Sequence, residues 1–195
     1  MQKQQLRARM KALRAACEDR RALDNGIFEN LFSQPFMNAE TFFVYVSFGS
    51  EADTRRIIEE LFKRGKTVFL PRVAGQRMQC VRYVGQALEK GAFGIMEPQG
   101  DAEEIVPDVC LTPLLAADRR CARLGYGGGY YDRFFMDKQS RARLFFSDRK
   151  RIACGADGRF FGRRRDRAGS IISEVNRKCC NGHGNIPNAW ARCSL

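Results

Sequence analysis

The sequence predicts a single-domain α/β protein in which helices flank an open, mostly parallel sheet. Residues 41–47 (TFFVYVS) are β-branched or aromatic on both faces, which is typical of a buried strand in a parallel sheet. A helix over 54–64 and a strand over 66–71 follow at once, so these elements predict a right-handed parallel crossover. Another short apolar run, 108–113, precedes a glycine-rich segment that leads into a helix.

The N-terminal segment is predicted to form two helices. Within residues 2–23, four apolar residues recur at steps of four, three and four and give one apolar stripe: Leu6, Met10, Leu13 and Cys17. The Asp24-Asn25-Gly26 stretch is expected to break this helix. A short second helix over 27–32 is then expected to end before Pro35.

The helix over 54–64 has recognisable signals at both ends. Asp53 or Thr54 is expected to cap its start, and Gly65 is expected to end it. Four of its apolar side chains are expected to face inward: Ile57, Ile58, Leu61 and Phe62. A further strand is expected at 78–84.

The rest of the chain is less strongly patterned. The turn-rich stretch 88–98 is expected to expose Phe93 between two glycines, and a last strand is expected at 143–146. Residues 147–195 show no clear periodicity. We therefore expect one α/β domain over 1–146 and a divergent, basic and poorly ordered C-terminal segment over 147–195.

Composition excludes several classes of protein. The chain has 195 residues, of which 44% are hydrophobic, and this is enough for a globular core. No stretch approaches 18 apolar residues, and the N-terminus lacks an apolar signal region. We therefore expect neither a membrane span nor a secretory signal, and we expect a cytoplasmic protein.

Cysteine and histidine form no catalytic or metal-binding pattern. The eight cysteines are scattered without a CxxC pair, and the chain has one histidine, so zinc ligation of the usual spacing is unsupported. The cysteines are better explained as reduced thiols that act as small hydrophobic residues. A Ser-His-Asp or Cys-His mechanism would have to use His183, which lies in a polar stretch of glycine and asparagine.

The net charge of +12 is concentrated towards the C-terminus. Residues 1–136 hold 20 Lys and Arg against 17 Asp and Glu, whereas residues 137–195 hold 14 against 5. The basic C-terminal part is either a footprint for nucleic acid or a poorly ordered basic extension.

The segment from Arg123 to Arg133 (RLGYGGGYYDR) has the composition of a phosphate-binding loop. It has four glycines in five positions, and each would cost roughly 0.5–1 kcal/mol in a regular element. The helix that follows would present free N–H groups and the positive end of its dipole to a phosphate. Arg123 and Arg133 add positive charge, and Asp132 could ligate a metal ion that bridges phosphates.

This segment fits neither of the common nucleotide motifs. It lacks the lysine and Ser/Thr of a Walker A loop, and Tyr130 takes the last position of a GxGxxG pattern. A glycine-rich surface turn is the alternative interpretation.

Two further features are candidates for ligand binding. Lys3 and Arg7 form an i,i+4 pair and project from one side of the first helix. Glu51 follows the first strand of the crossover, at the carboxyl edge where ligands bind in such sheets. The alternatives are a solvated basic helix face and a solvated loop glutamate.

Five blocks over about residues 3–136 resemble the 5-formyltetrahydrofolate cyclo-ligase family, also called methenyltetrahydrofolate synthetases. The blocks agree with the family in residue type and spacing: Lys3-x-x-Leu6-Arg7, Tyr45-x-Ser47…Glu51-x-x-Thr54, Gly65-Lys66-x-Val68-x-Leu70-Pro71, Gly91-x-Phe93-Gly94-Ile95-x-Glu97-Pro98 and the segment from Arg123 to Arg133. The resemblance implies the cyclo-ligase fold, which is NagB/RpiA-like.

The resemblance also implies an activity. Members convert 5-formyltetrahydrofolate to 5,10-methenyltetrahydrofolate with ATP and Mg²⁺, and they release ADP and phosphate. ATP phosphorylates the formyl oxygen, N10 attacks the activated carbon, and phosphate leaves. Phosphoryl transfer needs positioning and charge neutralisation rather than a strong base, which agrees with the lack of a catalytic histidine or cysteine pattern.

Carried over position by position, the resemblance implies roles for particular residues. ATP would be bound by Lys3, Arg7, Arg123, Leu124, Gly125, Tyr126, Gly127, Gly128, Gly129, Tyr130 and Tyr131. The expected catalytic residues are Arg123 and Tyr131. The folate site would be lined by Val46, Glu51, Phe93 and Tyr126. Mg²⁺ would be held by Asp132 and Asp166.

The C-terminal segment departs from the family pattern. Its Arg- and Cys-rich stretch is unlike a sheet strand, so it is either a diverged end or the product of a shifted reading frame. Asp166 matches the family's second metal-binding acid only with a one-residue gap. Two other functions stay open: a folate- or nucleotide-binding relative without turnover, and an RNA-binding protein that uses the basic segment on the same scaffold. We expect a monomer with no membrane partner.

Overall fold

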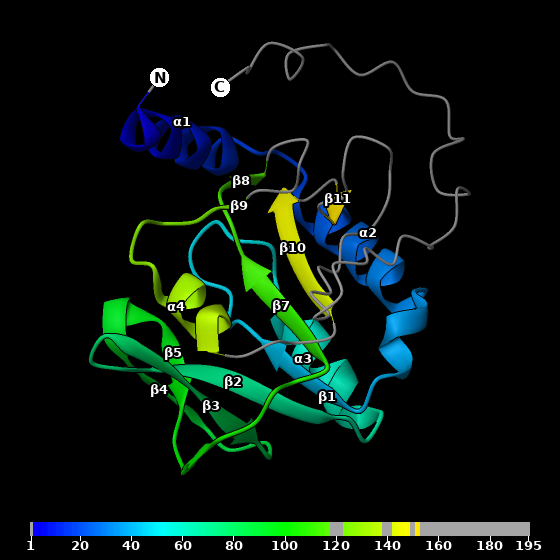
Figure 1. Ribbon diagram of the computed structural model, residues 1–195. Helices are drawn as coiled ribbons and strands as arrows, with labels where there is room; N and C mark the ends of the chain where they lie inside the picture. Colours follow the sequence, from blue (N-terminus) through cyan, green and yellow to red (C-terminus); the bar gives the residue numbers. More distant parts are fainter. Residues whose placement is uncertain (1, 118–122, 138–141, 149–150, 153–195) are drawn as a thin grey trace, which may run out of the picture.

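The computed structural model describes residues 2–117, 123–137, 142–148 and 151–152. In this part of the chain the main sheet has seven strands in the order β11-β10-β7-β1-β2-β3-β6 (Figure 1). Their bounds are β1 Thr41–Val44, β2 Thr67–Ala74, β3 Arg77–Tyr83, β6 Ala102–Glu103, β7 Val109–Pro113, β10 Ala142–Asp148 and β11 Arg151–Ile152. Two short pairs lie outside it: β4 Leu88–Lys90 with β5 Met96–Pro98, and β8 Ala116–Ala117 with β9 Arg123–Leu124.

Helices and 3₁₀ turns connect these strands. The α-helices are α1 Lys3–Ala15, α2 Arg20–Phe32, α3 Arg55–Lys63 and α4 Tyr130–Asp137, and the 3₁₀ turns are η1 Pro35–Asn38 and η2 Ala92–Gly94. None of the helices among the described residues combines the length and the apolar character that a membrane crossing requires.

The centre of the sheet is parallel. β1 pairs in parallel with β2 on one side and with β7 on the other, and β10 pairs in parallel with β7. The outer strands β3, β6 and β11 run antiparallel to their neighbours. Parallel neighbours require a crossover connection, and α3 provides the one between β1 and β2. The predicted open, mostly parallel sheet flanked by helices is confirmed.

Both faces of β1 are buried, as its sequence predicted. Successive side chains of a strand point to opposite faces, and the neighbours Phe42 and Phe43 are both fully buried. Phe42 packs in the cluster formed with α2 and α3. Phe43 packs on the other face, where its ring stacks on Phe134 of α4 with centroids 4.8 Å apart. Burial of each such ring contributes about 1.5–3 kcal/mol, so the sheet is held between helices on both faces (Figure 1).

The predicted boundary between the two N-terminal helices is wrong, whereas the predicted end of the second helix at Phe32 is confirmed. α1 ends at Ala15 and α2 starts at Arg20, so the Asp24-Asn25-Gly26 stretch lies inside α2 instead of breaking a helix. The guanidinium of Arg20 donates to two carbonyls at the end of α1, at 3.1 and 2.9 Å, and satisfies groups that a helix end leaves unpaired. Asp19, with φ of +52°, turns the chain between the two helices.

α3 forms close to where it was predicted. Gly65, with φ of +71°, follows its last turn, but Phe62 was wrongly expected to face inward and is 44% exposed. At the other end, the Thr54 hydroxyl donates to the Tyr45 carbonyl at 2.6 Å. This bond ties the start of α3 to the end of β1, and it therefore closes the loop that carries Glu51.

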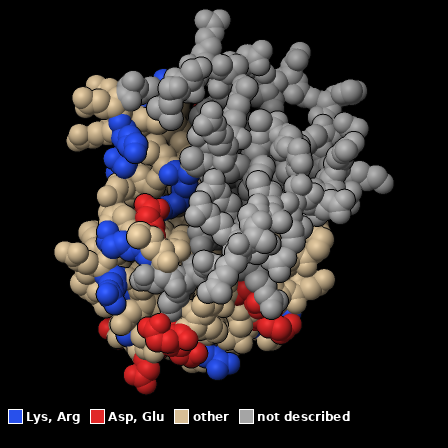
Figure 2. All heavy atoms as spheres, in the orientation of Figure 1, with Lys and Arg blue, Asp and Glu red and all other residues tan. Residues whose placement is uncertain are grey.

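The carboxyl ends of the central strands face α1. Figure 1 shows α1 lying beyond the tips of β7 and β10, with α4 on the near side of the same region. On the face shown in Figure 2, Lys and Arg side chains gather along the edge between α1 and α4, whereas most Asp and Glu side chains lie at the opposite end. This edge combines the usual ligand position of a parallel sheet with positive charge.

Candidate active site

Three segments meet at the carboxyl edge of the sheet: α1, the loop of residues 45–54 after β1, and residues 123–133, called here the glycine segment. Arg7 of α1 donates from Nε to the Gly125 carbonyl at 3.0 Å. The hydroxyl of Tyr126 is hydrogen-bonded to the Glu51 carboxylate. The fold thus brings together residues that the sequence placed in an ATP loop and in a folate site.

The glycine segment is a tight loop that leads into α4, as predicted. Gly127 and Gly129 have φ of +109° and +70°, values that glycine adopts without strain. A Cβ on Gly125 would lie 2.9 Å from Nη1 of Arg123, and a Cβ on Gly129 would lie 2.8 Å from Nη1 of Arg133. A side chain at either position would therefore require the neighbouring arginine to shift.

Arg123 is held between the end of β7 and the first turn of α4. It donates from Nη2 to Asp132 Oδ1 at 2.6 Å and from Nη1 to the Pro113 carbonyl at 3.1 Å, and its guanidinium lies 5.5 Å from the centre of the Tyr131 ring. The Asp132 side chain is 74% exposed. Only the Asp132 end of this pair is open to water, because the Arg123 side chain is 11% exposed, and the pair fixes the orientation of Arg123.

Arg133 is directed into the protein's own loops. It donates from Nε to the Gln76 carbonyl at 2.8 Å and from Nη2 to the Gly128 carbonyl at 2.9 Å, and it lies over the Tyr130 ring at 4.9 Å. The sequence predicted a charge that would face phosphate. The structure instead shows a brace between the glycine segment and the β2–β3 turn.

Glu51 lies in a chain of hydrogen bonds. Its Oε2 accepts from the Phe48 N–H at 2.8 Å, and its carboxylate is bonded to the Tyr126 hydroxyl. Arg14 of α1 donates from Nη1 to that hydroxyl at 2.5 Å and from Nη2 to the carbonyl of Leu114, just after β7. Three elements therefore meet at Tyr126.

Burial shapes the ionisation of this cluster. It raises the pKa of Glu51 above the ordinary value, although the hydrogen bonds to the carboxylate and the charge of Arg14 oppose the rise. Burial and the nearby Glu51 charge also raise the pKa values of Tyr45, Tyr126 and Tyr131. These tyrosines stay protonated at neutral pH, so they act as hydrogen-bond donors and not as bases.

Comparison with known proteins decides the family. Residues 1–147 match the model of the 5-formyltetrahydrofolate cyclo-ligase family. The chain belongs to this family. The resemblance inferred from the five sequence blocks is thereby confirmed.

Relatives of the cyclo-ligase family support the assignment. The chain is 37% identical over 113 residues to the 5-formyltetrahydrofolate cyclo-ligase of Escherichia coli K12, a match that spans 54% of this chain and 62% of that relative. It is 30% identical over 154 residues to the Haemophilus influenzae protein of the same name, which covers 72% and 81% of the two chains. The matched part thus falls short of two thirds of the Escherichia coli protein.

Solved structures of the family have the same fold. The NMR structure of Aquifex aeolicus 5,10-methenyltetrahydrofolate synthetase is 31% identical and superposes with a TM-score of 0.67 over 75% of this chain and 78% of that one. The Mycoplasma pneumoniae synthetase is 23% identical, with a TM-score of 0.55 over 70% and 78%, and supports the fold alone.

The other predicted cyclo-ligase residues are placed as follows. Lys3 is exposed at the start of α1, one turn before Arg7. Phe93 is 68% exposed, and its ring meets that of Tyr130 edge to face at 5.7 Å. The Val46 side chain is 5% exposed and is buried in the core. Leu124 lies in β9, just before the glycines.

The predicted metal ligands are only partly within the described structure. Asp132 presents an exposed carboxylate at the first turn of α4. Asp166 lies outside the described residues. Among the residues that the structure does describe, no group of three or more His, Cys, Asp or Glu side chains could hold a metal ion by itself.

Sequence reasoning missed Arg14, although a signal was present. Arg14 follows Arg7 by seven residues, which is close to two turns of a helix at 3.6 residues per turn. Lys3, Arg7 and Arg14 therefore share one side of α1. The predicted basic face was assigned to the first two alone, because the first family block ends at Arg7.

Proposed function

We propose that this protein uses ATP to close 5-formyltetrahydrofolate to 5,10-methenyltetrahydrofolate, with release of ADP and phosphate. The observation that carries the proposal is the hydrogen bond between Tyr126 and Glu51. Tyr126 belongs to the glycine segment expected to bind ATP, and Glu51 is expected to bind the pterin. Two ligands held by these residues would therefore lie next to each other, as phosphoryl transfer between them requires.

The nucleotide phosphates would bind between the glycine segment and α1. The start of α4 offers backbone N–H groups and the positive end of a helix dipole. Arg7 lies against the loop, with its Cζ 3.5 Å from the position of a Cβ on Gly127. Lys3 and Arg123 would add positive charge from α1 and from β9.

The folate would bind over Glu51. A pterin presents neighbouring N–H groups, and a carboxylate can accept from two of them at once. The exposed ring of Phe93 offers an apolar surface on which the folate could pack. Its edge-to-face contact with Tyr130 keeps this surface beside the glycine segment.

The proposed reaction has two steps. The formyl oxygen forms a bond to the γ-phosphorus of ATP while the bond to the bridging oxygen breaks, and ADP is released. N10 then attacks the activated formyl carbon, the carbon–oxygen bond breaks, and phosphate leaves with the former formyl oxygen and takes up the proton from N10. Arg123 would neutralise charge on the transferred phosphoryl group, and protonated Tyr131 would donate a hydrogen bond to it.

Asp132 fits a role in binding Mg²⁺ that arrives with ATP. Mg²⁺ is usually held by one or two carboxylates together with substrate phosphates and water. Asp132 supplies an exposed carboxylate beside the proposed phosphate site, and Asp166 is our proposed second acid. When bound, Mg²⁺ would neutralise charge on the phosphates.

An absorbance assay tests the proposal. The full chain is mixed with ATP, Mg²⁺ and 5-formyltetrahydrofolate, and we expect methenyltetrahydrofolate and one phosphate per product. Arg123→Ala, tested in parallel, should be inactive. If no product forms at high protein concentration while ATP still binds in a calorimeter, the protein is a binding relative without turnover. Salt-sensitive RNA binding that is lost on truncation after Lys138 would instead favour the RNA-binding alternative.

A further inference from the structure

We propose that Arg14 is a positioning residue of this site, which holds the Tyr126 hydroxyl so that it donates its proton to the Glu51 carboxylate. The expected effects on enzyme kinetics rest on the proposed function. The contacts among Arg14, Tyr126 and Glu51 do not, because they belong to the protein without ligands. Neither the family blocks nor the expected ATP and folate residues include Arg14.

The first support is the set of contacts that Arg14 makes. Its two terminal nitrogens donate to different elements, Nη1 to the Tyr126 hydroxyl at 2.5 Å and Nη2 to the Leu114 carbonyl. Its guanidinium also lies 5.9 Å from the centre of the Tyr126 ring. A planar group with donors in a fixed fork suits such a double contact, whereas a lysine has a single terminal nitrogen.

The second support is the direction of the hydrogen bonds. A guanidinium has donors and no acceptor, so the Tyr126 oxygen must accept from Arg14. The hydroxyl proton is then left for the carboxylate of Glu51, which accepts only. Arg14 therefore determines which way the hydroxyl points, and with it the donor that Glu51 receives beside the Phe48 N–H.

The third support is electrostatic. The groups that face Glu51 are Arg14 from α1, Tyr126 from the glycine segment, Tyr131 from α4 and Tyr45 from the end of β1. Arg14 supplies the positive charge in this set, and it lowers the Glu51 pKa against the effect of burial. Without Arg14 the carboxylate would lose both an oriented donor and a compensating charge.

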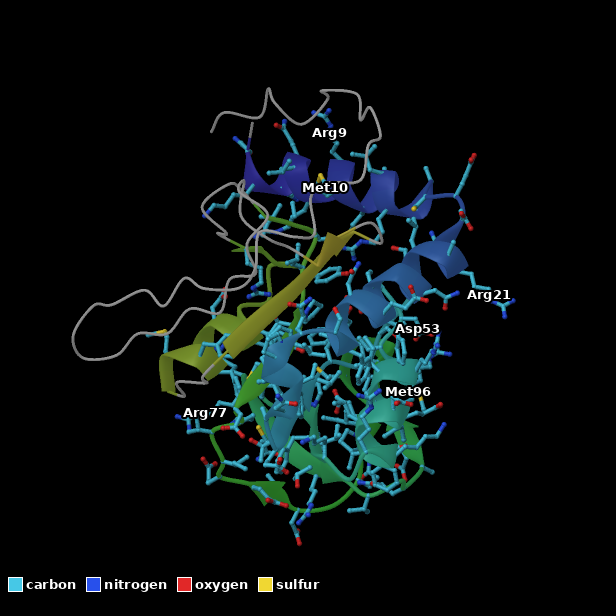
Figure 3. The ribbon with its side chains drawn as sticks, turned by 90° about the vertical axis from the view of Figure 1, so that its right-hand side faces the viewer. Arg9, Met10, Arg21, Asp53, Arg77 and Met96 are labelled. Atoms are coloured by element: carbon cyan, nitrogen blue, oxygen red, sulfur yellow. The ribbon has the colours of Figure 1, made fainter. Side chains whose placement is uncertain are left out.

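A second arginine of α1 provides a control that distinguishes the positioning role of Arg14 from a general effect of losing an arginine on this helix. Figure 3 shows Arg9 on the side of α1 that points away from the sheet. Met10 is buried and Arg9 is exposed. Arg9 therefore gives a matched control: the same helix and the same side chain, without contact to the site.

The experiment compares Arg14→Ala, Arg14→Lys and Arg9→Ala in the full chain. We expect Arg14→Ala to raise the KM for 5-formyltetrahydrofolate on the order of tenfold, as for a lost hydrogen bond to a charged group, with a smaller change in the KM for ATP. The acidic limb of kcat/KM for the folate should move to higher pH, because neutral Glu51 then persists further up the pH scale. Arg14→Lys should restore the limb, and Arg9→Ala should match the wild type.

A second readout does not depend on activity. Carbon-13 NMR titration of the Glu51 carboxyl in the protein alone should give a higher pKa in Arg14→Ala than in the wild type. If the wild type proves inactive, the proposed function fails and this titration still decides the role of Arg14. An unchanged Glu51 titration in a folded Arg14→Ala protein overturns the inference. A lower melting temperature with an unshifted pH limb would also overturn it, because that is the pattern of a purely structural residue.

Discussion

Glu51 is a carboxyl group in a buried position, where the loss of contact with water disfavours its negative charge. Its pKa is raised in the folded protein relative to an ordinary carboxyl group, so the folded state binds the proton more tightly than the unfolded chain does. The stability that this group contributes is therefore full below the pKa of the unfolded chain and is lost as pH rises through the raised folded pKa. At neutral pH the fold is less stable because Glu51 is ionised.

We predict that Glu51→Gln makes the protein more stable and worse at binding folate. Glutamine keeps the shape and an acceptor oxygen but carries no charge, so the free energy of unfolding should rise relative to the wild type at about pH 8 and converge with it at about pH 4. Urea denaturation at both pH values measures this. Glu59, exposed on α3, gives the control variant Glu59→Gln. A Glu51→Gln protein that gains no stability at the higher pH would contradict the prediction.

The sequence could predict single site residues but not the contacts between them. Glu51 follows a strongly patterned strand, and Lys3 and Arg7 lie at helical spacing in a family block, so their positions follow from local pattern. The bond from Arg14 to Tyr126 joins residues 112 positions apart in the chain. Such a contact depends on how α1 is placed across the sheet, and no local pattern carries that information.

At the scale of elements, the glycine segment combines left-handed backbone geometry with close packing, and the effects of the two on a substituted side chain can be separated. Gly129 and Gly65 have nearly the same positive φ, +70° and +71°. A Cβ at Gly65 would meet nothing within 4 Å, whereas one at Gly129 would lie 2.8 Å from Arg133. Gly65 therefore reports the cost of strain alone.

We predict that Gly129→Ala and Gly65→Ala each lower the free energy of unfolding by about 1–2 kcal/mol, the cost of an L-residue in left-handed geometry. Of the two variants, only Gly129→Ala should weaken ATP binding. Its added methyl group displaces the Arg133 side chain, which then no longer holds the Gly128 carbonyl. Denaturation and calorimetric titration with ATP measure the two effects. Equal ATP affinity in both variants would show that the brace is not needed for the phosphate site.

The turn around Phe93 keeps a large ring in an unfavourable position. Phe93 has φ of +59° and is 68% exposed. The Glu97 carboxylate, which is buried, accepts hydrogen bonds from the Ala92 and Val73 backbones and so holds the turn. Strain of this kind in an exposed aromatic residue points to a role in binding.

We therefore predict different stabilities for two variants that both remove the ring. Phe93→Ala keeps the strain and Phe93→Gly relieves it, so Phe93→Gly should be more stable than Phe93→Ala by about 1 kcal/mol. Both should bind 5-formyltetrahydrofolate more weakly than the wild type, and to a similar extent. Thermal denaturation and equilibrium folate binding test this. If Phe93→Gly bound folate more tightly than Phe93→Ala, in line with its greater stability, the affinity would not depend on the ring and packing of folate on Phe93 would be excluded.

Elements with strong periodic patterns were predictable, and those defined by tertiary contacts were not. β1, β2, β3 and β7 lie within a few residues of their predicted ranges. For β1 the reason is that its β-branched and aromatic residues occupy both faces of a buried parallel strand. The break after α1 was missed because the side chain of Arg20 caps the helix, and no glycine or proline announces it. The short β4–β5 and β8–β9 pairs are defined by their pairing and have too few residues to show a period.

At the scale of the whole molecule, the described core is built from the first two thirds of the chain. The buried residues of both hydrophobic clusters lie between Ile27 and Phe134. The family match covers residues 1–147, and most of the excess positive charge lies after residue 136. We therefore propose that the folding unit is the α/β domain of residues 1–146 together with the sheet residues up to Ile152, and that the basic segment after it is an addition.

This proposal predicts the behaviour of a chain that ends at residue 152. Such a chain keeps every residue of the two clusters and the contacts among α1, Glu51 and the glycine segment, so it should unfold in one cooperative transition and bind ATP with the affinity of the full chain. Circular dichroism during heating and calorimetric titration with ATP measure both properties. Turnover is expected to fall, because truncation removes Asp166, the proposed second Mg²⁺ ligand. Asp166→Ala in the full chain is the matched variant, and it should show the same loss of turnover if the acid is the reason. A truncated chain without a cooperative transition would mean that residues 153–195 are part of the folding unit.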